Sequence, residues 1–191
     1  MNIKAQDIGK KFGRNWIFRN LDFEIKSGEK VAITGKNGSG KSTLLQILSG
    51  YLTPSKGSIF YNENDTSEGV NAIFIGPYIE IIEEFTLIEL LRFHSKFKEP
   101  LIPLEEMAKR ASIPLGKRID DFSTGMKQRA KLIIAFFFES ELIFMDEPTS
   151  NLDAEGYDWW KKEINLTSGK TTIIASNQEN EIAISSHLIN L

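Results

Sequence analysis

The chain has no cysteine, little net charge and no long hydrophobic run, and each absence excludes a class of protein. Without a cysteine among its 191 residues it has no disulfide framework and no thiolate metal site. A net charge of −3 argues against a dedicated nucleic-acid-binding protein, which usually carries a basic face, although a local cradle can still bind one nucleotide. The longest apolar run, residues 132–138, is far shorter than the roughly 20 residues of a membrane span. The N-terminus also lacks a signal-peptide pattern, so we expect another polypeptide to hold the protein at a membrane if it works there.

Short apolar segments alternate with amphipathic ones along most of the chain. A hydrophobic content of 41% is enough for a sizeable core, and the length predicts one domain. The apolar segments predict strands at residues 31–34, 72–75, 142–146, 171–175 and 188–191. The segments with helical spacing predict helices at residues 42–48, 125–138, 153–165 and 179–185. This alternation is typical of an α/β protein with a largely parallel sheet and helices on both faces.

Two parts of the chain do not follow this alternation. Residues 3–8 and 21–25 alternate apolar and polar side chains, which predicts half-buried strands. Residues 84–121 predict a helical insert, because Thr86 and Glu89 form a capping-box pattern ahead of a run with helical spacing.

A glycine-rich segment lies between the predicted strand at 31–34 and the predicted helix at 42–48. It fits the pattern G-x-x-x-x-G-K-[ST] and consists of Gly35, Lys36, Asn37, Gly38, Ser39, Gly40, Lys41 and Ser42. In such a loop, glycines let successive backbone N–H groups point at phosphate oxygens, and the helix N-terminus adds positive charge. Lys41 would reach the β- and γ-phosphates, and the Ser42 hydroxyl would bind Mg²⁺. The alternative is a simple turn before a helix, and the flanking strand and helix argue against it.

The predicted strand at 142–146 ends in two carboxylates, Asp146 and Glu147. Together with Ser42, Asp146 is expected to bind Mg²⁺. Glu147 is the candidate catalytic residue, because a carboxylate beside the γ-phosphate can orient the attacking water or accept its proton. Taken alone, such a strand end is often only the exposed end of a sheet, so this interpretation depends on the glycine-rich loop.

A third motif, at residues 122–126, lies between the first two. Its sequence, Phe122-Ser123-Thr124-Gly125-Met126, resembles the Leu-Ser-Gly-Gly-Gln signature of the ATP-binding cassette (ABC) family, the nucleotide-binding domains of ABC transporters. The resemblance extends over essentially the whole chain. It implies a P-loop NTPase fold in a single domain, residues 1–191, with a mostly parallel sheet core, a small antiparallel β subdomain and a helical subdomain at about 84–138.

The resemblance also implies roles for individual residues. The family signature contacts the γ-phosphate of ATP on the opposing subunit, and here it comprises Ser123, Thr124, Gly125 and Met126. The family's dimer-interface loop, usually Ser-Ala-Leu-Asp, corresponds to Ser150, Asn151, Leu152 and Asp153. The ATP-binding residues would be Phe12, Gly35, Asn37, Gly38, Ser39, Gly40, Lys41, Ser42 and Thr43. Phe12 stands where an aromatic ring stacks on adenine, with Ile17 as an apolar neighbour. Without the resemblance, Ser123, Thr124 and Asp153 would indicate only helix caps. Phe12 alone would be interpreted as a core residue.

Two positions depart from the family pattern. The family's glutamine that contacts Mg²⁺ and the attacking water falls at about Pro77, which has no side-chain acceptor. The family's histidine at the γ-phosphate switch position is replaced by Asn177, which can donate a hydrogen bond but cannot carry charge. Because Lys41, Asp146 and Glu147 are all present, we expect ATP hydrolysis. We expect it to be slow because of these two departures.

The resulting hypothesis is an ATP-binding and ATP-hydrolysing subunit of an ABC transporter, with Mg²⁺ as cofactor. Two copies, or this chain and another ABC subunit, would enclose ATP, and closure would move a separate transmembrane permease from the cytoplasmic face of the membrane. We expect no nucleic-acid partner. One alternative is an ATP-dependent dimerisation switch with little or no hydrolysis, favoured by Pro77 and Asn177. Another is a soluble cassette ATPase of translation or DNA repair, although such relatives usually carry two cassettes, a long coiled coil or a basic linker.

Overall fold

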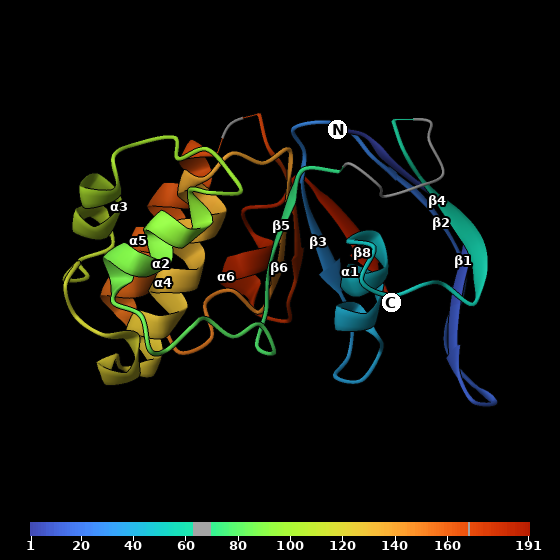
Figure 1. Ribbon diagram of the computed structural model, residues 1–191. Helices are drawn as coiled ribbons and strands as arrows, with labels where there is room; N and C mark the ends of the chain where they lie inside the picture. Colours follow the sequence, from blue (N-terminus) through green and yellow to red (C-terminus); the bar gives the residue numbers. More distant parts are fainter. Residues whose placement is uncertain (63–69, 168) are drawn as a thin grey trace. The chain divides into compact units, whose positions relative to one another are not determined.

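The computed structural model describes residues 1–62, 70–167 and 169–191 (Figure 1). The chain forms two compact units. The first consists of Met1–Phe74, Glu141–Glu147 and Gly169–Leu191, and the second of Ile75–Ser140 and Pro148–Ser168. Residues 84–138 therefore fall within the second unit. In the described part of the chain, no helix combines the length and the apolar character needed to cross a membrane.

The first unit contains a three-stranded antiparallel sheet in the order β2-β1-β4. Its strands are β1 (Ile3–Phe12), β2 (Asn15–Ile25) and β4 (Lys56–Tyr61). Side chains of β1 alternate between core and solvent, with Ile3 and Ala5 buried and Lys4 and Gln6 exposed. This is the period-2 pattern from which a half-buried strand was predicted.

The hairpin of β1 and β2 is longer than the sequence predicted. Pairing continues to Phe12 and Asn15, so only Gly13 and Arg14 form the turn. Residues 9–20 are rich in lysine and arginine, and the pairing shifts register within them. Both features break the alternation on which the shorter prediction rested.

A five-stranded sheet in the first unit has the order β5-β6-β7-β3-β8. Its strands are β3 (Lys30–Thr34), β5 (Ala72–Ile75), β6 (Leu142–Asp146), β7 (Thr171–Ala175) and β8 (His187–Asn190). The pairs β6–β7, β7–β3 and β3–β8 are parallel, and every residue of β6 and β7 is buried. Helix α1 (Lys41–Leu48) contributes Leu44, Leu45 and Leu48 to one core cluster with residues of both sheets. These two sheets confirm the predicted α/β fold class.

The strand register brings the carboxyl ends of three parallel strands to one edge of this sheet. Asp146 of β6 lies opposite Ala175 of β7, which lies opposite Ile33 of β3. Because parallel strands run in the same direction, the segments that follow them leave from the same edge. The glycine-rich loop, Glu147 and Asn177 therefore all start there. Helix α6 (Glu179–Ile182), which follows Asn177, is shorter than the predicted 179–185.

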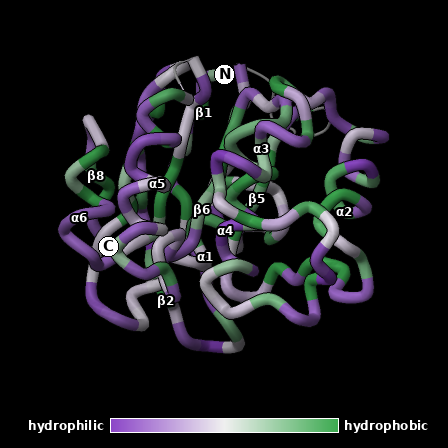
Figure 2. The backbone as a smooth tube through the Cα atoms, turned by 90° about the vertical axis from the view of Figure 1, so that its left-hand side faces the viewer, coloured by the Kyte–Doolittle hydropathy of each residue, from purple (hydrophilic) through white to green (hydrophobic). Residues whose placement is uncertain are grey.

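The second unit is helical. Its helices are α2 (Leu87–His94), α3 (Leu104–Arg110), α4 (Thr124–Phe137), α5 (Ala154–Leu166) and the short 3-10 helix η1 (Ile119–Asp121). Hydrophobic and hydrophilic residues alternate along α2 (Figure 2), whose Leu87, Leu90 and Leu91 are buried. The Glu89 carboxylate accepts hydrogen bonds from the N–H and the hydroxyl of Thr86, at 2.8 and 2.7 Å. The helix therefore begins where the capping-box pattern predicted.

Candidate functional site

The glycine-rich loop connects β3 to α1 in a conformation that favours glycine. Gly35, Gly38 and Gly40 have positive φ, and at Gly40 (φ 103) a Cβ would collide with the side chain of Ile17. The backbone of such a loop can approach a phosphate closely. Within the described residues, the buried hydroxyl of Ser39 has no hydrogen-bond partner and faces Gly35, where an added Cβ would lie 2.7 Å from it.

Lys41 is the first residue of α1 and is only 8% exposed. Its ammonium donates to the backbone oxygens of Gly35 at 3.1 Å and Lys36 at 3.3 Å. An ammonium bonds an ionised oxygen more strongly than a neutral carbonyl. A triphosphate in the loop would therefore draw the Lys41 ammonium away from these two carbonyls.

A cavity of about 370 Å³ opens beside the loop. It is lined by Ile17, Asn37, Gly38, Gly40, Lys41, Ser42, Thr43 and Glu147. Six of the predicted ATP-binding residues thus surround one space, together with the candidate catalytic residue. Phe12 does not line this cavity and lies at the end of β1, where 54% of it is exposed. The alternative that Phe12 is a core residue is therefore wrong.

Asp146 is the last residue of β6 and is 5% exposed. Burial raises the pKa of its carboxyl, and a hydrogen bond with the Ser42 hydroxyl opposes this shift. The negative charges of Glu147 and Glu181 raise the pKa further, whereas the charge of Lys41 lowers it. A cation bound beside Asp146 would therefore stabilise its ionised form.

The contact between Ser42 and Asp146 provides a donor set that fits magnesium. Both side chains offer oxygen, and Mg²⁺ is usually bound through one or two carboxylates together with waters and substrate phosphates. Among the described residues there is no group of three or more His, Cys, Asp or Glu that could hold a metal ion.

Glu147 directly follows Asp146 and has a left-handed backbone conformation, φ 47, which is uncommon for a residue with a Cβ. Its N–H donates to the Ala175 oxygen at 2.9 Å, which anchors this conformation to β7. The side chain is exposed and lines the cavity with Lys41 and Ser42. Backbone strain of this kind clusters at active sites, so it supports the catalytic position predicted for Glu147.

Asn177 follows β7 and contacts the glycine-rich loop. Its Nδ2 donates to Oδ1 of Asn37 at 2.5 Å, a hydrogen bond that the sequence did not predict. The structure thus brings the predicted γ-phosphate switch position to one of the predicted ATP-binding residues. The two histidines lie elsewhere: His94 packs against Phe138, and His187 begins β8.

The signature and dimer-loop residues meet in the second unit. The Ser123 hydroxyl caps α4 by accepting from the N–H of Met126 at 3.2 Å. A Cβ on Gly125 would lie 2.9 Å from the backbone oxygen of Asn151, so the two segments are in contact. Asn151 has φ 68, which asparagine tolerates well, and Asp153 caps α5. The other predicted residues of these segments are Thr124, in the first turn of α4, and Ser150 and Leu152, in the loop before α5.

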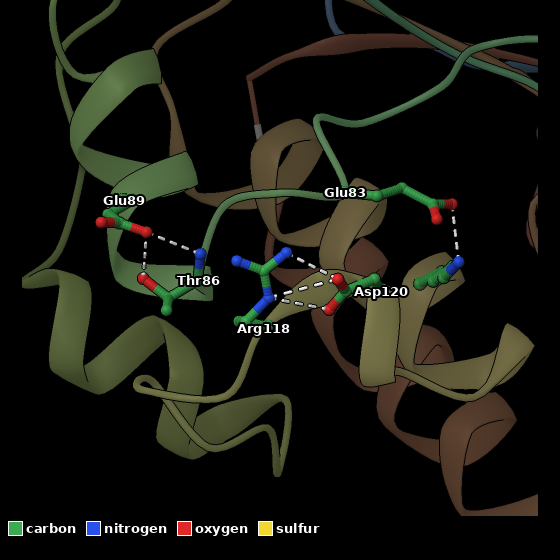
Figure 3. A network of polar contacts seen from close by, with 6 residues as sticks. Glu83, Thr86, Glu89, Arg118 and Asp120 are labelled. Carbon is green, nitrogen blue, oxygen red and sulfur yellow. Dashed lines mark hydrogen bonds and ion pairs between the residues drawn. The ribbon is translucent and has the colours of Figure 1, made fainter.

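A polar network joins the segment after β5 to the start of α4 (Figure 3). Glu83 and Lys127 form an ion pair at 2.6 Å, and the N–H of Asp120 donates to the Glu83 backbone oxygen at 3.0 Å. Arg118 and Asp120 form a second ion pair at 2.6 Å, just before the signature. Exposed pairs of this kind add little stability. The sequence signal for the network was weak: only the glutamate-rich stretch at 80–84.

Two further contacts in the second unit concern predicted or neighbouring site residues. Pro77 lies in a turn in which the N–H of Ile79 donates to the Gly76 oxygen at 3.1 Å. Buried Gln128, next but one after Met126, donates from Nε2 to the Pro148 oxygen at 2.7 Å. This hydrogen bond ties α4 to the start of the loop that contains the predicted dimer-interface residues.

Comparisons with known proteins agree with this arrangement. The chain matches the model of the ABC transporter family over residues 18–150. It is 28% identical to the sulfate/thiosulfate import ATP-binding protein CysA 2 of Rhizobium meliloti, over 95% of this chain and 54% of that protein. It is 31% identical to the putative hemin import ATP-binding protein HrtA of Staphylococcus aureus, over 81% of this chain and 79% of that protein. The chain thus spans just over half the length of the sulfate/thiosulfate relative.

Solved structures share the fold. A putative ABC transporter ATP-binding protein from Pyrococcus furiosus has a TM-score of 0.87 at 22% identity, covering 100% of this chain and 98% of that chain. A dimeric ATP-binding cassette in a post-hydrolysis state, bound to ADP and Pi, has a TM-score of 0.83 at 24% identity, covering 99% and 94%.

Proposed function

Because the chain belongs to the ABC transporter family, we propose that it is an ATP-binding and ATP-hydrolysing subunit that drives a separate permease. The observation that carries this proposal is the convergence of Lys41, Ser42 and Glu147 on one cavity, with Asp146 hydrogen-bonded to Ser42. Each of these side chains has a defined task in phosphoryl transfer to water. The chain also has a signature segment that caps a helix and leaves Ser123 and Thr124 exposed.

The proposed reaction assigns a role to each side chain of the site. Backbone N–H groups of residues 35–42 hold the phosphates, and the Lys41 ammonium moves from its two carbonyl partners to a phosphate oxygen. Ser42 and Asp146 would hold Mg²⁺, which would supply positive charge to neutralise the phosphates. Glu147 orients the attacking water or accepts its proton. The Asn177 amide supplies the one hydrogen bond available at the switch position.

Two cassettes act together in the proposed cycle. The Ser123–Met126 segment of one copy completes the ATP site of the other, and the loop at residues 150–153 forms part of the interface. The second cassette is another copy of this chain or a different ABC subunit. Hydrolysis opens the pair, and the movement is passed to the permease on the cytoplasmic face of the membrane. We place the docking surface on the second unit, at residues 77–83 and the neighbouring helices.

The relatives are named for the import of chemically unrelated substrates. Sulfate or thiosulfate, hemin and ribose each appear in the name of one relative. This fits a subunit that supplies energy for transport, while the transport pathway lies in a different polypeptide.

A dimerisation switch with little hydrolysis is the second candidate, and one contact favours it. The Asn177 amide is engaged with Asn37, and Pro77 offers no side-chain acceptor for the attacking water. ATP binding alone would then close the pair, and nucleotide exchange would open it. This function needs Lys41 and Ser123 but not Glu147.

Phosphate release by the purified protein separates the two candidates. We expect slow steady-state release with Mg·ATP, and we expect Glu147→Gln to reduce turnover by about 100-fold or more while ATP still binds. The control is Glu141→Gln, an exposed glutamate immediately before β6, which should leave turnover unchanged. Nucleotide binding without turnover by the unmodified protein would select the switch. Turnover that survives Glu147→Gln would refute the catalytic role.

A further inference from the structure

Lys10 on β1 is a nearly buried lysine, with 9% of it exposed. Its ammonium donates to the backbone oxygen of Thr53 at 2.7 Å and lies 5.2 Å from the centroid of the Phe12 ring. Lysine is seldom buried unless its charge is compensated, because removing an ammonium from water is costly. Here one carbonyl and one ring face provide that compensation.

The partner of Lys10 is itself held in place. The N–H of Ser55 donates to the Gly9 oxygen at 2.8 Å, and the N–H of Lys11 donates to the Ser55 hydroxyl at 3.2 Å. These two hydrogen bonds tie the turn after Thr53 to β1 on both sides of Lys10. The position of the ammonium is therefore fixed by backbone atoms.

An ammonium held over one face of Phe12 favours ring orientations that keep that face toward it. A cation within about 6 Å of a ring centroid is attracted to the ring face, and the attraction grows when water is excluded. The cation covers one face of the ring, while 54% of Phe12 is exposed. A ring held in this way stacks on a flat ligand with little further loss of conformational freedom.

We propose that Lys10 is a positioning residue for the base of the bound nucleotide: it holds Phe12 as a preorganised stacking platform. The proposal rests on the proposed function, because the triphosphate is taken to lie in the loop at 35–42 and the base to stack on Phe12 as the family resemblance predicts. It predicts that Lys10 contributes to the binding affinity for ligands with an aromatic base, and not to the affinity for ligands that consist of phosphates alone. A purely structural lysine would not make that distinction.

The test compares Mg·ATP with Mg·tripolyphosphate by calorimetric titration. We expect Lys10→Met to weaken Mg·ATP binding by about three- to ten-fold and to leave tripolyphosphate binding unchanged. Phe12→Ala should weaken Mg·ATP at least as much, and Lys10→Met should add nothing in that background. Lys10→Arg, which keeps the cation, should restore most of the affinity.

Lys11→Met is the matched control, because Lys11 lies on the same strand and its ammonium is 5.5 Å from a different ring, that of Trp16. It should change neither affinity. Melting temperatures are measured alongside, and Lys10→Gln, which keeps an N–H donor for Thr53, replaces Lys10→Met if the latter unfolds.

Equal losses for both ligands, or a Lys10 effect that persists in Phe12→Ala, would overturn the proposal and leave the proposed function intact. Failure of the unmodified protein to bind Mg·ATP would overturn both.

Discussion

Asn177 occupies the predicted γ-phosphate switch position of the proposed hydrolysis. Its amide donates to Asn37, and unlike a histidine it cannot bring positive charge to the γ-phosphate. We predict that Asn177→His raises steady-state phosphate release by about 10- to 100-fold, on the scale of one added donor to a developing charge. Asn177→Gln, which keeps an amide, serves as the control and should not reproduce the gain. A histidine variant no faster than the unmodified protein would contradict this role for position 177.

At the residue scale, motifs of neighbouring residues can be recognised in the sequence. Contacts between residues far apart in the chain cannot. Lys41 was assigned from a motif of short, fixed spacing, and Asp146 from its place at the end of an apolar strand, and both roles stay predictions. The contacts of Lys10 and Lys127 could not be predicted, because their partners lie 43 and 44 residues away. No local pattern distinguishes such a lysine from an ordinary solvated one.

The contact between α4 and the loop before α5 depends on the absence of a side chain at Gly125. A Cβ there would lie 2.9 Å from the Asn151 oxygen, which is closer than real Cβ contacts allow, so one segment must shift. We predict that Gly125→Ala impairs ATP-dependent dimerisation, measured by size-exclusion chromatography in the Glu147→Gln background. ATP binding by the single chain should persist.

Gly116→Ala is the matched control for this prediction. It lies in the same unit, and its added Cβ would have no neighbour within 4 Å. Dimerisation of Gly125→Ala equal to that of Gly116→Ala would show that the contact with Asn151 has no part in the interface.

An ion pair links α3 to α5. Arg110 donates to the 2%-exposed carboxylate of Glu163 at 3.0 Å. We predict that Arg110→Met lowers the free energy of unfolding by about 1–3 kcal/mol at neutral pH, less than for a fully buried pair because Arg110 is partly solvated. Lys109→Met, an exposed cation on the same helix, should cost little.

The cost of Arg110→Met should depend on pH. Burial raises the pKa of Glu163, and the charge of Arg110 opposes this rise. A raised pKa means that the folded state binds a proton more tightly than the unfolded state, so stability is lost as pH rises between the two pKa values. Removing Arg110 raises the folded-state pKa further. Urea unfolding should therefore show a larger loss at neutral pH than under mildly acidic conditions, and a loss independent of pH would contradict this origin.

Elements with one strong periodicity were predictable, and the others were not. Helix α4 was predicted at 125–138 and spans Thr124–Phe137, because its apolar residues recur at helical spacing. The ends of β1 and β2 were missed, because basic side chains occupy positions that alternation would make apolar. Helix α6 was predicted too long, since a four-residue helix leaves almost no periodic signal.

Across the whole molecule, the site depends on a strand order that local patterns do not encode. The order β5-β6-β7-β3-β8 places β3 beside β7, although more than 130 residues separate them in the chain. Alternation of elements predicted a parallel sheet, and the family resemblance supplied the rest of the fold. The parallel register then explains why residues 35–42, 146–147 and 177 leave from one edge.

The most direct test is calorimetric titration of Mg·ATP into the purified protein, its Lys41→Ala variant and a Lys36→Ala control. Lys36 is exposed in the same loop, so its loss should change the affinity only slightly. If this loop binds the triphosphate, Mg·ATP binding should be saturable. Lys41→Ala should weaken the affinity by about 100-fold, the scale of one charge-assisted hydrogen bond to phosphate. No heat of binding, or equal affinity in the protein and its Lys41→Ala variant, would contradict the phosphate-binding role on which every other assignment depends.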